Sequence, residues 1–214
     1  MVNEEVKRAY EDYAAECESG GNITVTRIEN VKRSLVKSEG RKVIESIKSR
    51  EKTFDKVVEK CIRKGYANTE EDINMDIIKK KVQDVYGIRI ITTYEDDIYK
   101  VVKILHQIPG INIDPDDEVD YVNNPKANGY SSYHLIARVE VYSHANGGSK
   151  LVPIEIQIRD LGMDYWAAVE HEIKYKNSCP PPEAEAKFKQ IAELLSAVRK
   201  EMIDLRELTK NPAN

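Results

Sequence analysis

The chain has 214 residues, of which 41% are hydrophobic and 33% are charged, as is typical of a globular protein with its own core. Its net charge of −4 argues against a dedicated nucleic-acid-binding protein, and no apolar run approaches the roughly 20 residues that a membrane span needs. The N-terminus lacks the basic start and apolar stretch of a secretion signal. Cys17, Cys61 and Cys179 are scattered without metal-type spacing, which indicates free thiols in a reducing cytoplasm.

Helices are predicted in the first fifty residues. Residues 3–18 carry apolar and aromatic side chains at helical spacing, and Gly20-Gly21 is expected to end this helix. Residues 23–28 alternate like a short strand, but Ile28, Val31 and Leu35 fit a helix, which is the preferred interpretation. Residues 37–50 are expected to be helical in their second half, after a break at Gly40.

The next predicted helix, which follows Thr53, has two distinct faces. One is a buried stripe of Phe54, Val57, Val58, Cys61 and Ile62. The other is a basic row of Lys52, Lys56, Lys60 and Lys64, with Arg63 beside it. Like charges at this spacing repel each other, so the row indicates an anionic ligand, and a solvated face is the alternative.

The middle of the chain alternates between helix and strand. A helix is predicted from Thr69 to Lys81, a strand over residues 88–93 and a helix from about Asp96 that Pro109-Gly110 closes. Residues 111–121 are expected to hold one or two short acidic strands. Residues 126–130 form a turn that leads into a hairpin.

That hairpin joins residues 134–142 to residues 151–159. Every even position from Val152 to Ile158 is aliphatic, and the first strand alternates in the same way. Because successive side chains of a strand point to opposite faces, one face of the hairpin is apolar and the other is polar. The polar row of the second strand is Pro153, Glu155, Gln157 and Arg159. An ordinary antiparallel sheet with one solvated face, in which Glu155 pairs with an arginine, fits this pattern equally well.

Two helices are predicted after the hairpin. Asp160 can cap a helix that runs to about residue 176 and carries Trp166, the sole tryptophan, and Cys179-Pro180-Pro181-Pro182 breaks it. The last helix covers about residues 183–208. Its apolar residues alternate at spacings of three and four like a coiled-coil seam, which either docks on the domain or meets another subunit; they are Phe188, Ile191, Leu195, Val198, Met202 and Leu205.

The sequence holds the components of a phosphate-handling site, namely cations, carboxylates for Mg²⁺ and a stacking group. The cations are Arg50, Lys52, Lys60 and Arg63, with Arg89 at the start of a strand. Asp84 precedes that strand and Glu155 lies in the hairpin, so the fold can bring the two carboxylates together. Tyr130 is expected to be exposed by its Asn-Gly turn, as a stacking platform for a base. A Walker loop, a kinase glycine-rich loop and a Gly-x-Ser-x-Gly motif are all absent from the sequence.

Five ordered motifs carry a resemblance to a known family. They are residues 48–52 (Lys-Ser-Arg-Glu-Lys), 84–89 (Asp-Val-Tyr-Gly-Ile-Arg), 129–134 (Gly-Tyr-Ser-Ser-Tyr-His), 152–159 (Val-Pro-Ile-Glu-Ile-Gln-Ile-Arg) and 166–171 (Trp-Ala-Ala-Val-Glu-His). Together they resemble the synthetase domain of the RelA/SpoT alarmone family. The resemblance implies an α+β fold with a nucleotidyltransferase-like mixed β-sheet flanked by helices. It divides the chain into an N-terminal helical region (1–47), the synthetase domain (48–178) and a C-terminal helix for packing or oligomerisation (183–210).

The resemblance also implies a reaction, the transfer of pyrophosphate from ATP to the 3′-hydroxyl of GDP or GTP with release of AMP. By motif position, Arg50 and Arg89 would sandwich adenine, and Lys52, Lys60 and Arg63 would bind the ATP phosphates. Asp84 would bind Mg²⁺, and Glu155 would be either the second ligand of the ion or the base for the 3′-hydroxyl. Asp84, Glu155 and Arg89 would be the catalytic residues. Tyr130 would stack on guanine. The remaining acceptor residues would be Lys126, His134, Gln157, Asp164, Glu170 and His171.

The sequence departs from the family at a few points. Tyr86 stands where the family usually has alanine, Glu51 interrupts the basic motif, and Asp164 replaces an asparagine of some relatives. None of the four histidines precedes an aspartate, so the sequence lacks the His-Asp motif of the family's hydrolase. We therefore expect synthesis without hydrolysis, in a cytoplasmic protein that, like many small alarmone synthetases, is a homotetramer.

Two alternatives remain open from the sequence. A toxic relative would pyrophosphorylate the 3′ end of tRNA or make adenosine alarmones; the basic row of residues 52–64 favours it, whereas the acidic net charge and the motif around Tyr130 oppose it. A catalytically silent nucleotide-binding regulator is the alternative of another class, and retention of both Asp84 and Glu155 opposes that. A purely structural role would rest on the C-terminal seam.

Overall fold

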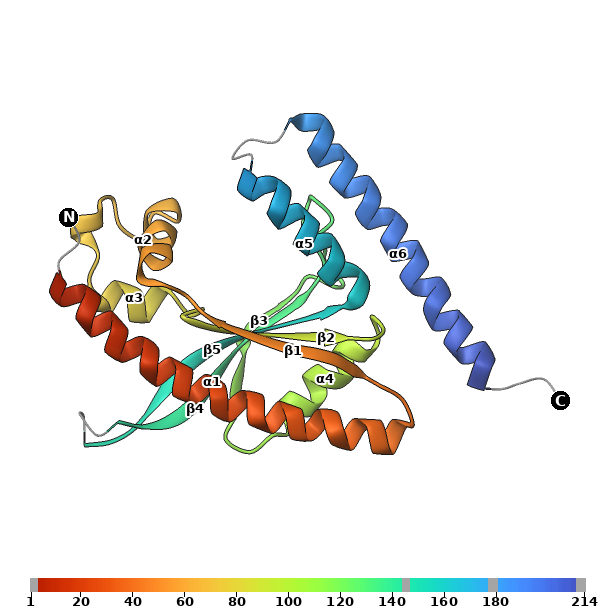
Figure 1. Cartoon of the computed structure of the whole chain (residues 1–214), viewed down its shortest axis with the longest axis horizontal. Helices are drawn as coiled ribbons and strands as arrows, with labels where there is room; N and C mark the ends of the chain where they lie inside the picture. The colour runs from red at the N-terminus through yellow and green to blue at the C-terminus, as the bar shows by residue number, and fades with distance from the viewer. Residues whose placement is uncertain (1–3, 144–146, 177–180, 211–214) are drawn as a thin grey trace.

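The computed structural model describes residues 4–143, 147–176 and 181–210, in which a five-stranded sheet is surrounded by six α-helices (Figure 1). The elements are α1 (Glu4–Glu39), β1 (Ile44–Glu51), α2 (Phe54–Arg63), a 3-10 turn (Glu70–Asp72), α3 (Met75–Lys81), β2 (Tyr86–Thr92), α4 (Asp97–Leu105), β3 (Asn112–Asp120), β4 (Tyr133–Ser143), β5 (Gly148–Asp160), α5 (Leu161–Lys176) and α6 (Pro182–Lys210). The strand order is β1-β2-β5-β4-β3, with β2 and β5 parallel and the other pairs antiparallel. The predicted α+β fold with a mixed sheet is confirmed.

The hairpin of β4 and β5 lies at the centre of the fold. Its predicted apolar face is buried: Val152, Ile154, Ile156 and Ile158 have no exposed surface. This face joins residues of α1 and α4 in the main core, and Figure 1 shows both helices on the same side of the sheet. The polar face of the hairpin is therefore the face that remains for a site.

The N-terminal helix does not end at Gly20-Gly21, as the sequence suggested, but runs for 36 residues. A glycine inside a helix costs about 1 kcal/mol relative to alanine, so the pair needs another reason. A Cβ at Gly20 would lie 2.6 Å from Cγ2 of Val152, and one at Gly21 would lie 2.2 Å from Cε1 of Tyr86. The two glycines let α1 pack closely on the sheet.

The prediction of a helix in the second half of residues 37–50 is wrong, because strand β1 begins at Ile44. The expected break at Gly40 is present, with a φ of 64° that favours glycine. Beyond it, β1 pairs along β2, with Lys48 opposite Arg89. Pairing with a distant strand overrides the local helical pattern, and the expected boundary at residue 47 falls inside β1.

The C-terminal helices form a second, smaller core. Asp160 caps α5 as predicted, its Oδ1 accepting the Met163 N–H at 3.1 Å. This core consists of Tyr130, Met163, Trp166, Ala167, Phe188 and Ala192. The predicted seam of α6 is buried at Phe188, but Val198, Met202 and Leu205 are about half exposed. Seam docking is therefore confirmed only for the first part of α6.

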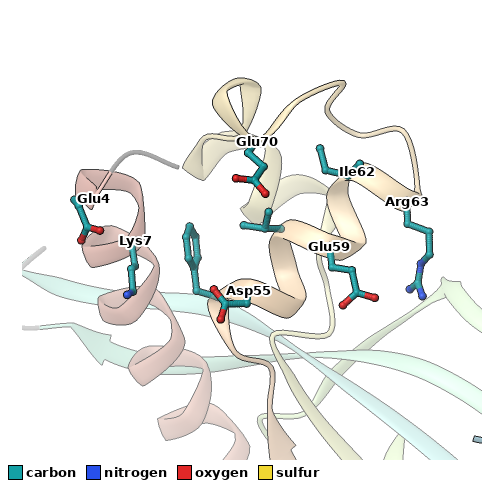
Figure 2. A pocket seen from close by; sticks show the side chains of 9 residues that line it. Glu4, Lys7, Asp55, Glu59, Ile62, Arg63 and Glu70 are labelled. Atoms are coloured by element: carbon teal, nitrogen blue, oxygen red, sulfur yellow. The ribbon is translucent and has the colours of Figure 1, made fainter. Parts of the chain in front are cut away.

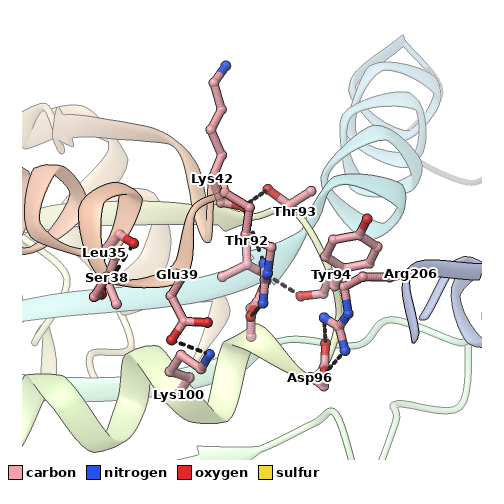
Figure 3. A network of polar contacts seen from close by, with 12 residues as sticks. Leu35, Ser38, Glu39, Lys42, Thr92, Thr93, Tyr94, Asp96, Lys100 and Arg206 are labelled. Atoms are coloured by element: carbon pink, nitrogen blue, oxygen red, sulfur yellow. Dashed lines mark hydrogen bonds and ion pairs between the residues drawn. The ribbon is translucent and has the colours of Figure 1, made fainter. Parts of the chain in front are cut away.

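The far end of α6 is held by charge rather than by apolar packing (Figure 3). Arg206 forms two hydrogen bonds with the Asp96 carboxylate, at 3.0 and 2.6 Å, and its guanidinium lies 4.6 Å from the centre of the Tyr94 ring. Both partners belong to the loop between β2 and α4. Among the described residues, none of these helices is long and apolar enough to cross a membrane.

The buried cysteines Cys17 and Cys61 are free thiols, as predicted. Cys179 and Pro180, at the predicted break between the last two helices, lie outside the described residues.

Candidate active site

Strand register brings the predicted site residues into two adjacent rows on the polar face. One row, from β1 to β4, is Lys48, Arg89, Gln157 and His134; the next is Arg50, Gly87 and Glu155. Gly87 has no side chain, and its neighbours leave open space above it. A recess of about 140 Å³ results, lined by residues that include Arg50, Asp84, Arg89 and Glu155.

Asp84 is held between two lysines at one end of this recess. Nζ of Lys60 lies 2.7 Å from Oδ1, and Nζ of Lys52 lies 3.0 Å from Oδ2. Burial raises the pKa of the Asp84 carboxyl, but Lys60 and Lys52 outweigh it, and the net shift of the pKa is downward. Lys56 pairs instead with the exposed Glu59. The predicted basic row therefore contributes Lys52 and Lys60 to the site, whereas Lys56 lies on a solvated face.

Glu155 lies near Asp84 and is likewise half-buried. Burial, and next the charge of Asp84, raise the pKa of the Glu155 carboxyl, and a hydrogen bond of 2.9 Å from Gln157 Nε2 opposes the shift. The expected alternative of an arginine partner is wrong, because Arg138 binds Asp117 at 2.6 Å and Arg159 binds Gln157 at 2.8 Å. Two neighbouring carboxylates with opposite pKa shifts are typical of a reaction centre.

Tyr130 is buried, contrary to the prediction that its turn exposes it; only 8% of the residue is exposed. Its ring packs against Trp166 at 6.4 Å between centroids, and the cations of Lys126 and Arg159 lie 4.8 and 5.1 Å from its centre. The turn is present, with φ of +88° at Gly129, but packing of α6 against it closes the space. A base can stack on Tyr130 only after one of these neighbours moves.

His134 is neutral and forms a hydrogen bond with the Tyr130 hydroxyl. Arg159 donates to this hydroxyl at 2.8 Å, and Nε2 of His134 lies 2.9 Å from it. Burial, with Arg159, Lys126 and Arg89 adding to it, lowers the pKa of His134 to about 3. The contact of 3.8 Å between Nδ1 and Glu155 is therefore not an ion pair at neutral pH.

Asp164 extends from α5 toward three cations. Its carboxylate lies 3.2 Å from Lys48, 3.5 Å from Arg89 and 3.7 Å from Arg159. The buried Nε atoms of both arginines have no hydrogen-bond partner within the described part of the chain. Buried donors without partners are typical of a site that completes its hydrogen bonds with a ligand.

The remaining predicted acceptor residues lie on or near α5. Glu170 accepts hydrogen bonds of 2.7 Å from Asn128 and from Lys174. Lys126 covers the rings of Tyr121 and Tyr130, and burial, followed by Lys64, lowers its pKa. His171 is exposed on α5, next in sequence to Glu170.

Arg63 is the predicted phosphate ligand that does not join the recess. Arg63 follows Lys60 by three residues on α2 and lies beside Glu59 and Ile62. There it borders a separate groove of about 760 Å³ between α1 and α2 (Figure 2). Ile62, expected in the buried stripe, is 38% exposed on the same flank.

Asp84 and Glu155 fit the hard oxygen ligands that Mg²⁺ prefers. The charge of Asp84 raises the pKa of Glu155, as expected of carboxylates that share a cation site. No cluster of three metal-ligating side chains occurs in the described ranges. Mg²⁺ commonly retains water and takes phosphate oxygens as further ligands, so a pair of carboxylates is sufficient.

Sequence reasoning missed three residues of this region. Lys48 pairs with Asp164, Arg159 connects Gln157 to Tyr130, and Trp166 backs the Tyr130 ring. The strand alternation had placed Arg159 on the same face as Glu155 and Gln157, and that pattern was sufficient to predict Arg159 as a site residue.

Comparisons with known proteins identify the family of the chain. The family described as "Region found in RelA / SpoT proteins" matches residues 49–179. The chain is 36% identical over 169 residues to GTP pyrophosphokinase YwaC of Bacillus subtilis, covering 78% of this chain and 76% of that protein. It is 32% identical over 164 residues to GTP pyrophosphokinase YjbM of the same organism, covering 76% and 72%.

Solved structures extend the likeness to nearly the whole chain. Small alarmone synthetase 1 from Bacillus subtilis, bound to its product pppGpp, has a TM-score of 0.81 at 27% identity and covers 94% of this chain and 97% of that one. Small alarmone synthetase 2 from the same organism has a TM-score of 0.78 at 31% identity, covering 92% and 98%. The match of the family over residues 49–179 and the identity to these relatives show that the chain belongs to the RelA/SpoT family.

Proposed function

We propose that the chain is a (p)ppGpp synthetase that transfers pyrophosphate from ATP to the 3′-hydroxyl of GDP or GTP and releases AMP. The observation that carries the proposal is Asp84, held by Lys52 and Lys60 beside the half-buried Glu155. The 36% identity to a GTP pyrophosphokinase and the likeness to a synthetase bound to pppGpp support the same reaction.

ATP is proposed to bind at the β1 end of the recess. Arg50 and Arg89 are diagonal neighbours on an antiparallel pair, which separates such residues by about 7–8 Å. A flat base with about 3.5 Å to each side fills that spacing, so adenine stacks between the two guanidiniums. Lys52 and Lys60 then exchange the Asp84 carboxylate for the triphosphate.

Mg²⁺, held by Asp84 and Glu155, would neutralise phosphate charge when bound. The oxygen of the acceptor 3′-hydroxyl forms a bond to the β-phosphorus of ATP, and the bond from that phosphorus to the α–β bridging oxygen breaks, leaving AMP. Glu155 takes the hydroxyl proton, for which its raised pKa suits it. The lysines stabilise the developing negative charge.

The acceptor is proposed to bind on the α5 side. Guanine stacks on Tyr130 once Lys126 or Arg159 has moved from its ring, and these cations then turn to the acceptor phosphates. His134, Gln157, Asp164, Glu170 and His171 complete this side. Neutral His134 is suited to hydrogen bonding rather than to charge pairing.

We further propose that the enzyme is cytoplasmic and forms a homotetramer in which the exposed seam of α6 contributes to the interface. Leu194, Val198, Met202 and Leu205 are each more than 48% exposed, which is costly in a monomer. Light scattering that finds a monomer at micromolar concentration would contradict the tetramer.

The function is tested by incubating the purified chain with Mg²⁺ and γ-labelled ATP, with GDP, GTP, ATP or deacylated tRNA as acceptor. Label is expected on the guanosine nucleotides and is expected to disappear in Glu155→Gln. Label on tRNA alone would favour the toxic relative. Nucleotide binding without any transfer would favour the silent regulator.

A further inference from the structure

We infer that α1, which lies wholly outside the matched family region, positions the ATP-binding strand β1 through the hydroxyl groups of Tyr10 and Tyr86. The inference rests on the proposed assignment of Arg50 and Lys52 to ATP. It gives a role in the reaction to a helix that carries none of the five motifs.

Strand β1 needs external support because it is an edge strand. Within the described part of the chain, it pairs with β2 on one side and has no strand on the other. Arg50 lies near its end, and Lys52 is the first residue beyond it. An edge strand that is held on one side only would leave these two cations poorly fixed.

Helix α1 runs along β1 on one side of the sheet and bonds to its backbone at both ends (Figure 1). Near the start, Nζ of Lys32 donates to the carbonyl of Glu45 at 3.0 Å. Beyond the end, the hydroxyl of Tyr10 donates to the carbonyl of Lys52. Tyr10 is 2% exposed, and its ring packs 5.3 Å from Phe54 at the start of α2.

The bond from Tyr10 completes the fixation of Lys52. The N–H of Lys52 donates to the carbonyl of Val85 at 2.8 Å, and its side chain binds Asp84 at 3.0 Å. With its carbonyl held by Tyr10, Lys52 is fixed at its N–H, its carbonyl and its ammonium group. The position of the ammonium group relative to Asp84 therefore depends on α1.

Tyr86 forms the second link, between α1 and the middle of the site. Its hydroxyl lies 3.3 Å from Oδ1 of Asn22 and 3.1 Å from Oγ of Ser49. A hydroxyl has one proton, so Tyr86 donates to the Asn22 oxygen and accepts from Ser49. Ser49 lies between Lys48 and Arg50 on β1, and this bond holds the strand at the residue next to the proposed adenine ligand.

Gly21 makes the Tyr86 link possible. Any Cβ at this position would lie 2.2 Å from the Tyr86 ring, closer than atoms can approach. Tyr86 is buried directly against α1. The pair Gly21 and Tyr86 is therefore one complementary contact, in which the missing side chain accommodates the ring that carries the hydroxyl.

The test compares Tyr10→Phe and Tyr86→Phe with Tyr13→Phe, which removes a buried hydroxyl from the same helix away from β1. The first two variants are expected to raise KM for ATP roughly 3- to 10-fold, the loss expected for one hydrogen bond, with KM for GDP unchanged. Tyr13→Phe is expected to leave KM for ATP unchanged. Equal melting temperatures with unchanged KM for ATP in all three would overturn the inference.

A parallel Lys52→Ala variant separates this inference from the proposed function. If Lys52→Ala raises KM for ATP and the tyrosine variants do not, α1 has no positioning role while the site assignment stands. If Lys52→Ala leaves KM for ATP unchanged, the assignment of ATP to this side has itself failed, and the inference fails with it.

A second pair of variants tests the Gly21 contact. Gly21→Ala is expected to lower the melting temperature and raise KM for ATP, because the ring must move. Gly21→Ala combined with Tyr86→Ala is expected to restore the melting temperature toward that of Tyr86→Ala alone but not KM for ATP, since the hydroxyl is still missing. Recovery of KM for ATP in the double variant would contradict a role for the hydroxyl.

Discussion

The two sides of the recess are built from different interactions. On the β1 side, Lys52, Asp84 and Lys60 form a network of ion pairs whose side chains are 15–19% exposed. On the α5 side, Tyr130 and Trp166 lie in an aromatic core, and Tyr130 and Trp166 are 8% and 2% exposed. Both sides meet at β5, where Gln157 bonds to Glu155 and receives a bond from Arg159.

This difference separates two ways of preparing a binding site. The ion pairs of the β1 side hold the cations where a triphosphate can replace one carboxylate, so that side is already arranged for its ligand. The aromatic side is closed, and its stacking face becomes available only through movement of a cation or of α5 and α6. We therefore expect the first side to respond to charge and the second to packing.

The largest effect is expected where the two sides meet. Glu155→Gln should lower the transfer rate by about 10²–10³-fold, the loss typical of one catalytic electrostatic group. It should also raise the melting temperature at pH 7. The pKa of Glu155 is raised in the fold, so its ionised form is destabilising from its unfolded value upward, and a neutral amide removes this cost.

The transfer rate and the melting temperature together test whether Glu155 is a catalytic group that destabilises the fold when it is ionised. A lower melting temperature in Glu155→Gln would mean that Glu155 stabilises the fold as a charged group. Glu140→Gln, on the same strand pair but exposed, is the matched control and should change neither quantity.

A smaller effect is expected from breaking the ion pairs alone. Lys60→Met should raise KM for ATP by roughly 10- to 100-fold, in line with hydrogen bonds to charged groups, and should leave KM for GDP nearly unchanged. Lys56→Met, one turn earlier on the exposed row, is the control. Equal changes in KM for both nucleotides would show that the β1 side is not dedicated to ATP.

A loss of packing on the aromatic side should instead change KM for GDP and leave KM for ATP unchanged. Trp166→Phe loses the hydrogen bond of 3.0 Å to the Phe188 carbonyl and part of the contact with Tyr130. We expect a rise of about 10-fold in KM for GDP without change in KM for ATP. Tyr165→Phe, at an exposed neighbour, is the control.

The native tryptophan gives the same comparison without a mutation. Since Trp166 is the sole tryptophan, its fluorescence should change on addition of GDP and not of ATP. A response to ATP alone would contradict the division of the recess.

The smallest effect concerns pH. His134 has a folded pKa of about 3, below its unfolded value, so it contributes stability above about pH 6.5 that is lost as pH falls toward 3. His134→Gln should therefore flatten the decline of the melting temperature between about pH 6.5 and pH 4. An unchanged decline would mean that His134 is already charged in the folded protein.

Elements with local patterns could be predicted from the residues alone. The alternation of residues 151–159 correctly predicted a buried aliphatic face and set Glu155 and Gln157 on the opposite one, because a strand has a strict period of two. Likewise, the basic row of Lys52, Lys56, Lys60 and Lys64 indicated an anionic partner. The sequence could not show that one anionic partner of these lysines is Asp84 of the same chain.

Features that depend on distant neighbours could not be predicted in this way. Gly20-Gly21 indicates a helix end in isolation, but the sheet surface at Val152 and Tyr86 makes it a close contact. Residues 44–51 become a strand because β2 is available to pair with them. Tyr130 is buried, despite its turn, because α5 and α6 pack against it. Local periodicity fixes which way a side chain faces, whereas the packing of elements far apart in the chain fixes what it meets there.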